Sequence, residues 1–140
     1  FMQEGGLEKH NLVLQKKYAR IESREQRWEG LFAKDAEVIL VAYGTMSRIA
    51  RSAIRRLRAK GRNVGLIRPI TLWPFPRKIF ERVKSVGSRV KFLVVEMSYG
   101  QMLEDVLLAV NGKFPVEFLG RAGGGIPGED EIIEKVTKGY

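Results

Sequence analysis

The feature that most constrains the fold of this chain is a fourfold alternation between short apolar runs and segments of helical periodicity. The run AEVILVAYG at residues 36–44 is apolar and β-branched, which is typical of a strand buried on both faces of a sheet. The following segment, residues 45–61, places its apolar residues three and four positions apart, as on one face of a helix. Strands that alternate with helices in this way predict a mostly parallel sheet with helices on both faces.

The same two patterns recur to the end of the chain, and Gly or Pro residues stand at most of the boundaries between them. We therefore expect four strands and four helices in one α/β domain. The expected strands are residues 36–44, 63–69, 89–98 and 115–120, and the expected helices are residues 45–61, 74–87, 100–112 and 129–139.

A longer helix is expected before the first strand. Apolar residues recur at every seventh position from Leu7 to Trp28, which predicts one amphipathic helix over residues 7–32. The sequence thus indicates a helical lead-in over residues 1–35 and a three-layer α/β/α sandwich over residues 36–140.

Composition restricts the chemistry of the chain. It has no Cys among its 140 residues, which excludes disulfides, thiolate zinc sites, cysteine-ligated iron–sulfur clusters and Cys nucleophiles. No signal peptide and no apolar stretch long enough to span a membrane occur, so we expect a cytoplasmic protein. The chain begins with Phe1, and Met2 lacks a convincing start context, so we expect a fragment of a longer polypeptide.

The net charge of +9 comes almost entirely from one segment, because residues 37–82 carry 11 of the 25 basic side chains and only 2 of the 16 acidic ones. Four of these arginines lie in a narrow arc of the helix at residues 45–61, opposite its apolar stripe. Such an arc is usually a solvated face, but it also suits an acidic partner or a phosphate-rich ligand such as coenzyme A. Interleaved aromatics and reading motifs are missing, which argues against nucleic acid. The four are Arg48, Arg51, Arg55 and Arg58.

Function is expected at the carboxyl ends of the strands, where an open parallel sheet gathers its loops. The junction after the first strand offers a weak anion site, in which the free amides of the helix would meet the side chains of Thr45 and Ser47. The alternative is an ordinary N-cap formed by either hydroxyl. The anion candidates are Gly44, Thr45, Ser47 and Arg48.

The stretch GRAGGGIPGEDE at residues 120–131 contains a literal G-x-G-x-x-G, but it follows the last strand rather than the first. The helix after it begins with three carboxylates, which suit the helix dipole and repel a phosphate. A Walker loop is excluded as well, because no Gly-Lys-Ser/Thr follows. We therefore interpret the glycines as backbone that packs closely against another surface.

Catalytic groups are scarce in this sequence. The one histidine, His10, lies in the lead-in helix, and no nucleophile elbow, metal-ligand spacing or Cys/His pair occurs. Glu96 ends a buried strand, where pairing with Arg68 is favoured over a role in proton transfer. The residues predict no catalytic site and no metal site in this chain by itself.

Four segments in this order resemble the C-terminal part of the alpha subunit of 2-oxoacid:ferredoxin oxidoreductases: VAYGTMSRIARSAI, VGLIRPITLWPFP, FLVVEMSYGQMLEDVLLAV and PVEFLGRAGGGIP. The resemblance runs from about Lys9 to Ile133. It is closest to the type that acts on branched-chain 2-oxoacids, 3-methyl-2-oxobutanoate among them.

The resemblance implies the fold of the transketolase C-terminal domain, although the four expected strands include no counterpart of that fold's antiparallel edge strand. It also implies oxidative decarboxylation of a 2-oxoacid with coenzyme A, which gives an acyl-CoA, carbon dioxide and reduced ferredoxin. The diphosphate of thiamin diphosphate and its Mg²⁺ would be held mainly by the beta subunit, and the pyrimidine ring by the N-terminal domain of the alpha subunit. The iron–sulfur clusters would lie in another subunit, so this chain would hold no cofactor.

The resemblance therefore predicts a non-catalytic domain that serves assembly of domains and subunits, with a role in access of coenzyme A. Its partners would be the N-terminal domain of the same subunit and the other subunits, with ferredoxin reached through the complex. The alternative is a free-standing binding module that uses the basic helix for a phosphorylated ligand or nucleic acid. Interface candidates at the strand ends are Arg68, Trp73, Glu96, Tyr99, Gln101, Arg121, Gly123, Gly124 and Gly125.

Overall fold

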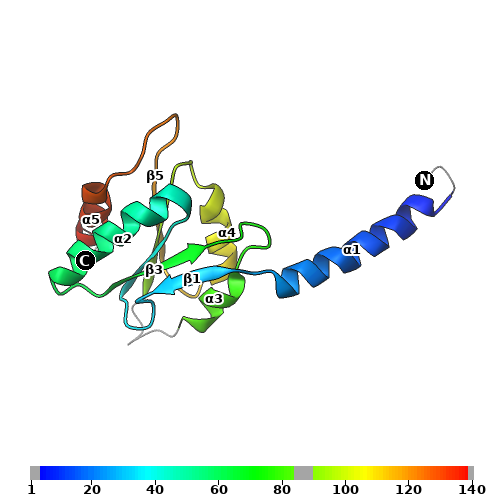
Figure 1. Cartoon of the computed structure of the whole chain (residues 1–140), viewed down its shortest axis with the longest axis horizontal. Coiled ribbons are helices and arrows are strands. Elements are labelled where there is room, and N and C mark those ends of the chain that lie inside the picture. Colours follow the sequence, from blue (N-terminus) through cyan, green and yellow to red (C-terminus); the bar gives the residue numbers. More distant parts are fainter. Residues whose placement is uncertain (1–3, 84–89, 139–140) are drawn as a thin grey trace.

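The computed structural model describes residues 4–83 and 90–138 of the chain, and these residues form a five-stranded mixed sheet with helices on both faces (Figure 1). The strand order is β1-β3-β2-β4-β5. The first edge strand, β1, runs antiparallel to β3, and all other neighbours are parallel. The predicted α/β sandwich with a mostly parallel sheet is confirmed. The strands are β1 (Trp28–Leu31), β2 (Val38–Val41), β3 (Val64–Pro69), β4 (Lys91–Glu96) and β5 (Val116–Gly120).

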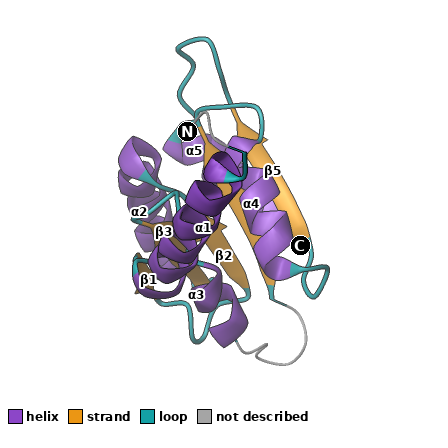
Figure 2. Cartoon of the chain, turned by 90° about the vertical axis from the view of Figure 1, so that its right-hand side faces the viewer, coloured by secondary structure: helices purple, strands orange, loops and turns teal. Residues whose placement is uncertain are grey.

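The helices cover the sheet in two layers (Figure 2). The helices α2 and α5 contact each other on one face, and α3 and α4 contact each other on the opposite face. A further helix, α1, precedes the sheet. The helices are α1 (Gly6–Arg24), α2 (Gly44–Ala59), α3 (Arg77–Arg82), α4 (Gln101–Val110) and α5 (Glu129–Lys138).

The sheet divides the core into two apolar clusters. Along β2 the side chains alternate between them, with Val38 and Leu40 packed beneath α2 and α5, and Ile39 and Val41 packed beneath α3 and α4. All four are fully buried. A central parallel strand covered on both faces needs apolar residues at every position, which explains why this run shows no polar alternation.

The lead-in helix is shorter than the sequence pattern predicts. It ends at Arg24, and the predicted last turn is instead the strand β1, in which Trp28 pairs with Pro69 and Leu31 with Leu66. The edge of β3 supplies backbone partners that an isolated helix end lacks, and this tertiary pairing overrides the heptad pattern. β1 is also the antiparallel edge strand that had no counterpart in the sequence pattern.

Several predicted boundaries differ from the structure by a few residues, as helix and strand ends commonly do. The predicted helix over residues 74–87 is observed only as α3. Its last residues, 84–87, lie outside the described part of the chain, as do residue 89 of the third expected strand and residue 139 of the last expected helix.

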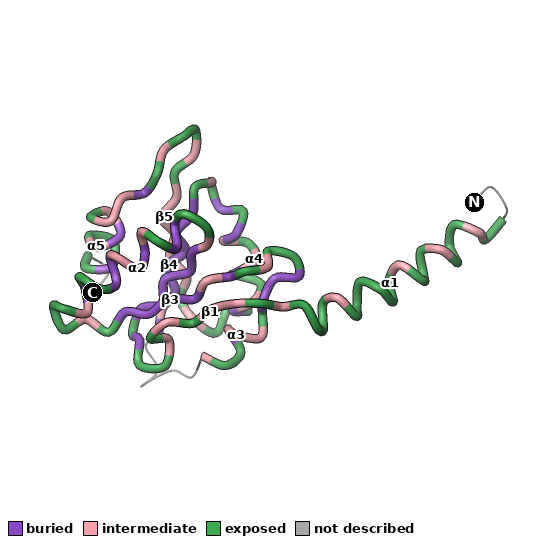
Figure 3. The backbone as a smooth tube through the Cα atoms, in the orientation of Figure 1, coloured by how far each residue is buried: buried purple, intermediate pink, exposed green. Residues whose placement is uncertain are grey.

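The helix α1 extends away from the sheet and buries none of its residues (Figures 1 and 3). Contacts near its carboxyl end connect it to the domain. The ring of Tyr18 lies edge-on to that of Trp73 with centroids 5.8 Å apart, and Lys78 Nζ donates to the Ser23 carbonyl at 2.7 Å. Within the described residues, no helix combines the length and the apolarity needed to cross a membrane.

Candidate functional site

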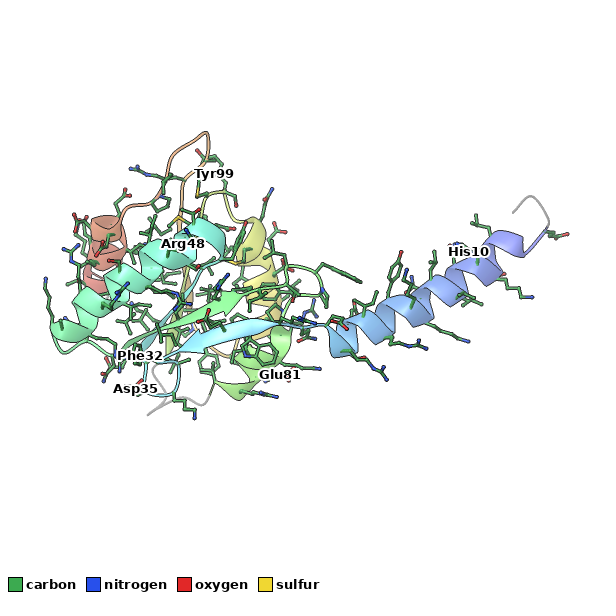
Figure 4. All side chains as sticks on the ribbon, viewed as in Figure 1. His10, Phe32, Asp35, Arg48, Glu81 and Tyr99 are labelled. Carbon is green, nitrogen blue, oxygen red and sulfur yellow. The ribbon has the colours of Figure 1, made fainter. Side chains whose placement is uncertain are left out.

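The carboxyl ends of the parallel strands carry an apolar surface. Among the residues that follow β3 and β4, Trp73 is 57% exposed and Tyr99 is 83% exposed. Figure 4 shows the Tyr99 side chain on a loop that projects from this end of the sheet. We call this set the carboxyl-edge surface, and it comprises Ile70, Leu72, Trp73, Met97 and Tyr99. These side chains lie on two loops at the same edge of the sheet, with β2 between their strands, and large exposed apolar side chains at one edge suit an interaction site.

A pocket of about 480 Å³ lies beside this surface, where β2 leads into α2. All four anion candidates from the sequence line it, and it also contains Arg51 from the next turn of α2 and Arg68 from the end of β3. The sheet has thus brought together arginines that are far apart in the sequence. We call it the arginine pocket, lined by Gly44, Thr45, Ser47, Arg48, Arg51 and Arg68.

One carboxylate holds two of these arginines. Glu29 Oε2 lies 2.5 Å from Arg51 Nη2 and 3.2 Å from Arg68 Nη1. The hydrogen bond from Arg51, then that from Arg68, holds the pKa of the Glu29 carboxyl below its ordinary value of 4.5. Glu29 lies on β1. The sequence analysis did not include it in the site, because residues 28–31 were expected to be helical.

The Glu29 ion pairs predict a pH dependence of stability. Because folding lowers the Glu29 pKa, its contribution is fully present above pH 4.5 and is lost as the pH falls through the lower pKa of the folded state. We expect Glu29→Gln to lower the free energy of unfolding by no more than about 1 kcal/mol at pH 7, since the pair is partly exposed. Urea denaturation at several pH values should show this difference shrinking below pH 4.5. Glu25→Gln is the matched control, and an equal pH-dependent loss in that variant would contradict the assignment.

The start of α2 is left uncapped by side chains. Its N-cap is Tyr43, which forms no side-chain capping bond, and the first turn contains no acidic residue. Ser47 Oγ donates to the Gly44 carbonyl at 2.7 Å instead. The interpretation of Thr45 or Ser47 as the N-cap is therefore wrong, because both lie inside the helix, past the position from which a hydroxyl can reach the free amides.

The predicted pairing of Glu96 with Arg68 is also wrong. β2 separates β3 from β4, and the two side chains lie on opposite faces of the sheet, Arg68 with the α2 face and Glu96 with the α4 face. Glu96 is completely buried and accepts hydrogen bonds from the backbone N–H groups of Met102 at 2.9 Å and Leu103 at 3.3 Å. It thus anchors the first turn of α4.

The glycine loop after β5 contributes exposed backbone to the same end of the sheet. Gly123 and Gly124 have positive φ angles of 67° and 86°, and a Cβ atom at either would meet nothing within 4 Å. Gly128 N donates to Glu131 Oε2 at 2.7 Å, so the chain's own carboxylate occupies the place where a dinucleotide phosphate would bind. Arg121 pairs with the same carboxylate group at 2.8 Å.

A second hollow, of about 380 Å³, is lined by the end of α1, the loop after β3, α3 and the middle of α4. Its lining includes the interface candidate Trp73 together with Arg77 and Asp105. Burial raises the pKa of Asp105, with the nearby Arg77 acting against that shift. The sequence analysis did not single out Asp105. Two interface candidates remain: Gln101 is exposed at the first position of α4, and Gly125 is half-buried in the glycine loop.

The described residues include no group of three His, Cys, Asp or Glu side chains placed to hold a metal ion. His10 lies on α1, remote from the carboxyl-edge surface (Figure 4). The arrangement around the strand ends is suited to binding surfaces and anions.

Comparison with known proteins gives consistent matches. Residues 36–132 match the family described as pyruvate:ferredoxin oxidoreductase core domain II. The chain is 47% identical over 138 residues to ketoisovalerate oxidoreductase subunit VorB of Methanothermobacter thermautotrophicus, covering 99% of this chain and 38% of that protein. It is 38% identical over 102 residues to 2-oxoglutarate synthase subunit KorA of Methanothermobacter marburgensis, covering 73% and 27% respectively. The chain thus spans less than half the length of these curated relatives.

Two solved structures share the fold. The 2-oxoglutarate:ferredoxin oxidoreductase of Magnetococcus marinus superposes with a TM-score of 0.74 at 22% identity, over 92% of this chain and 23% of that one. A split-gene transketolase described as an inactive beta4 tetramer superposes with a TM-score of 0.58 at 20% identity, over 79% and 40%. At these identities the similarity establishes the fold alone.

Proposed function

We propose that this chain is a non-catalytic domain of a 2-oxoacid:ferredoxin oxidoreductase subunit, because it belongs to the pyruvate:ferredoxin oxidoreductase core domain II family. The complete enzyme would convert a 2-oxoacid, coenzyme A and oxidised ferredoxin to an acyl-CoA, carbon dioxide and reduced ferredoxin. The domain would serve assembly, and its location would be the cytoplasm. We propose residues 36–140 as the family-type domain and the preceding residues as its lead-in, from which strand β1 completes the sheet of that domain.

The observation that carries the assembly role is the carboxyl-edge surface, on which Trp73 and Tyr99 are largely exposed. Aromatic side chains are among those that most often anchor protein interfaces. The N-terminal domain of the same subunit and the neighbouring subunits are the proposed partners. We propose interface roles for Arg68, Gln101 and Arg121 as well, because Arg68 and Arg121 lie at the carboxyl ends of β3 and β5 and Gln101 begins the helix after β4.

The iron–sulfur clusters and the Mg²⁺ of the family find no matching ligand set in the described part of this chain. The chain has no Cys to hold an iron–sulfur cluster, and its described carboxylates and histidine do not gather into a metal site. As the family resemblance implies, we propose that thiamin diphosphate, Mg²⁺ and the iron–sulfur clusters are held by the rest of the complex, and we derive no catalytic step from the residues present here.

We propose 3-methyl-2-oxobutanoate, also called ketoisovalerate, as the 2-oxoacid of the complex. The relatives named for ketoisovalerate are 47% and 44% identical over 138 residues, whereas a relative named for 2-oxoglutarate is 38% identical over 102 residues. The test is to capture the full-length parent from cell extract with an antibody to this domain and to assay dye reduction with several 2-oxoacids. Reduction that requires both coenzyme A and 3-methyl-2-oxobutanoate supports the proposal. An inactive lone polypeptide would contradict it.

The alternative of a nucleic-acid-binding module is weakened by the ion pairs of α2. Arg51 pairs with Glu29, Arg58 with Asp35, and Arg56 with both Glu129 and Asp130. These contacts neutralise much of the basic helix within the chain itself. Binding of nucleic acid through that helix would collapse steeply with added salt, whereas an apolar subunit interface would not.

The glycine loop gives a specific prediction for assembly. We expect Gly124→Trp in the full-length parent to reduce recovery of the complex, because a bulky side chain would stand between this loop and its partner. The domain itself should fold, since the added side chain has open space within the chain and the strained φ of 86° costs about 1 kcal/mol. Gel filtration of the complex and thermal unfolding of the domain separate the two effects. Gly124→Ala carries the same backbone strain without the bulk and is the control; a Gly124→Trp complex that stays fully assembled and active would refute the interface role.

A further inference from the structure

We propose that the arginine pocket binds the diphosphate group of a ligand. This inference goes beyond the assembly role, and nothing in it depends on that role. It starts from three guanidinium groups that line one pocket, those of Arg48, Arg51 and Arg68. Within the described chain the one carboxylate paired with any of them is Glu29, so the cluster keeps a net charge of about +2.

Two of the three arginines retain donors for a ligand. Among the described residues, Arg48 takes part in no ion pair or hydrogen bond, and its side chain is exposed beside the pocket (Figure 4). Arg68 Nε is buried and has no hydrogen-bond partner within the described residues. The Arg68 side chain as a whole is 38% exposed, so its guanidinium N–H groups beyond the one held by Glu29 are the donors that it offers to the pocket.

The backbone at the pocket also favours an anion. The N-terminus of α2 opens into it without a side-chain cap and without an acidic residue in the first turn. A Cβ atom at Gly44 would meet nothing within 4 Å, so no side chain narrows this approach. The free amides of such a helix start add donors that suit phosphate oxygens.

The size and the number of donors select a diphosphate rather than a single carboxylate. A carboxylate has two oxygens and satisfies one arginine in a bidentate pair, whereas a diphosphate presents enough oxygens to contact three guanidinium groups. The volume of about 480 Å³ lies in the range of small-molecule sites. Glu29 holds Arg51 and Arg68 at the pocket wall, so the ligand would meet arginines that are already placed.

The test is isothermal titration of the 140-residue chain with inorganic pyrophosphate at constant ionic strength. We expect saturable binding that Arg48→Gln weakens about tenfold, the loss of one charge-assisted contact. Arg68→Gln should weaken it by a similar factor. Arg48 makes no contact that the described fold depends on, so its variant keeps the test valid even if the Arg68 variant is unstable.

Arg55→Gln is the matched control, because it removes the same charge from the same arc of α2 without lining the pocket. Its affinity should stay within about twofold of the unaltered chain. An equal loss in the Arg55 and Arg48 variants would show binding to a general basic face and overturn the proposal. So would the absence of pyrophosphate binding, or tighter binding of a triglutamate peptide than of pyrophosphate.

A parallel titration with ADP tests whether the pocket recognises the diphosphate as part of a nucleotide. Tighter binding of ADP than of pyrophosphate supports a diphosphate carried on a nucleotide, and equal binding supports recognition of the diphosphate alone. Because these titrations use this chain in isolation, their failure would leave the assembly assay of the full-length parent unaffected.

Discussion

Replacing Glu96 by alanine is expected to lower the free energy of unfolding of this chain by about 3 kcal/mol or more. The Glu96 carboxylate is completely buried and accepts hydrogen bonds from the backbone amides of Met102 and Leu103. The substitution would leave both amides without this acceptor and would open a cavity between β4 and α4. The loss is a large fraction of the few kcal/mol that hold a domain of this size together.

Urea denaturation monitored by tryptophan fluorescence measures this loss. Glu96→Gln keeps the volume and one acceptor oxygen, so it should recover part of the stability lost in the alanine variant. Glu104→Ala, in the exposed first turn of the same helix, removes a side chain of the same type and size and should change stability by no more than about 0.5 kcal/mol. A Glu96→Ala domain as stable as the Glu104→Ala domain would show that the buried carboxylate does not anchor α4.

Gly65→Ala is expected to destabilise the domain by about 3 kcal/mol. Gly65 is buried in β3, and a Cβ atom there would lie 2.7 Å from the carbonyl oxygen of Phe32 and 3.1 Å from the Cα atom of Ala33. Both atoms belong to the backbone that follows β1. Because backbone cannot turn aside as a flexible side chain can, the substitution would push the connection between β1 and β2 away from the sheet.

Gly30→Ala on β1 is the matched control, since a Cβ atom at Gly30 meets nothing within 4 Å and the residue is exposed. We expect its midpoint in urea to stay close to that of the unaltered chain. Comparable loss in both variants would mean that glycine in this sheet matters for reasons other than the close approach of the Phe32 backbone.

The architecture was predictable from sequence because both of its signals are local. A central strand such as β2 must be apolar at every position when helices cover both faces, and its buried run shows this directly. The apolar stripe of α2 likewise lies in the spacing of its own residues. The four residues of β1 carry too little pattern for such a reading, and Trp28 also fits the heptad of the preceding helix.

The candidate site was likewise predictable from the sequence only in part. The sequence placed Gly44, Thr45, Ser47 and Arg48 at a strand–helix junction, and the structure lines one pocket with all four. Their status as a ligand site stays a prediction, as do the interface roles of the strand-end residues. The capping interpretation of Thr45 and Ser47 failed because it depends on the first helical residue, and a shift of one or two positions reverses it.

The sequence by itself determined the alternation of strands and helices, the residues that fill the core and the end of the sheet at which the unusual side chains gather. Only the tertiary structure decided that Glu29 joins Arg51 and Arg68, and that Glu96 meets the amides of α4 rather than an arginine. The physical reason is that periodicity is set by neighbours along the chain. The partner of a charged side chain depends instead on strand order and on which face of the sheet it occupies.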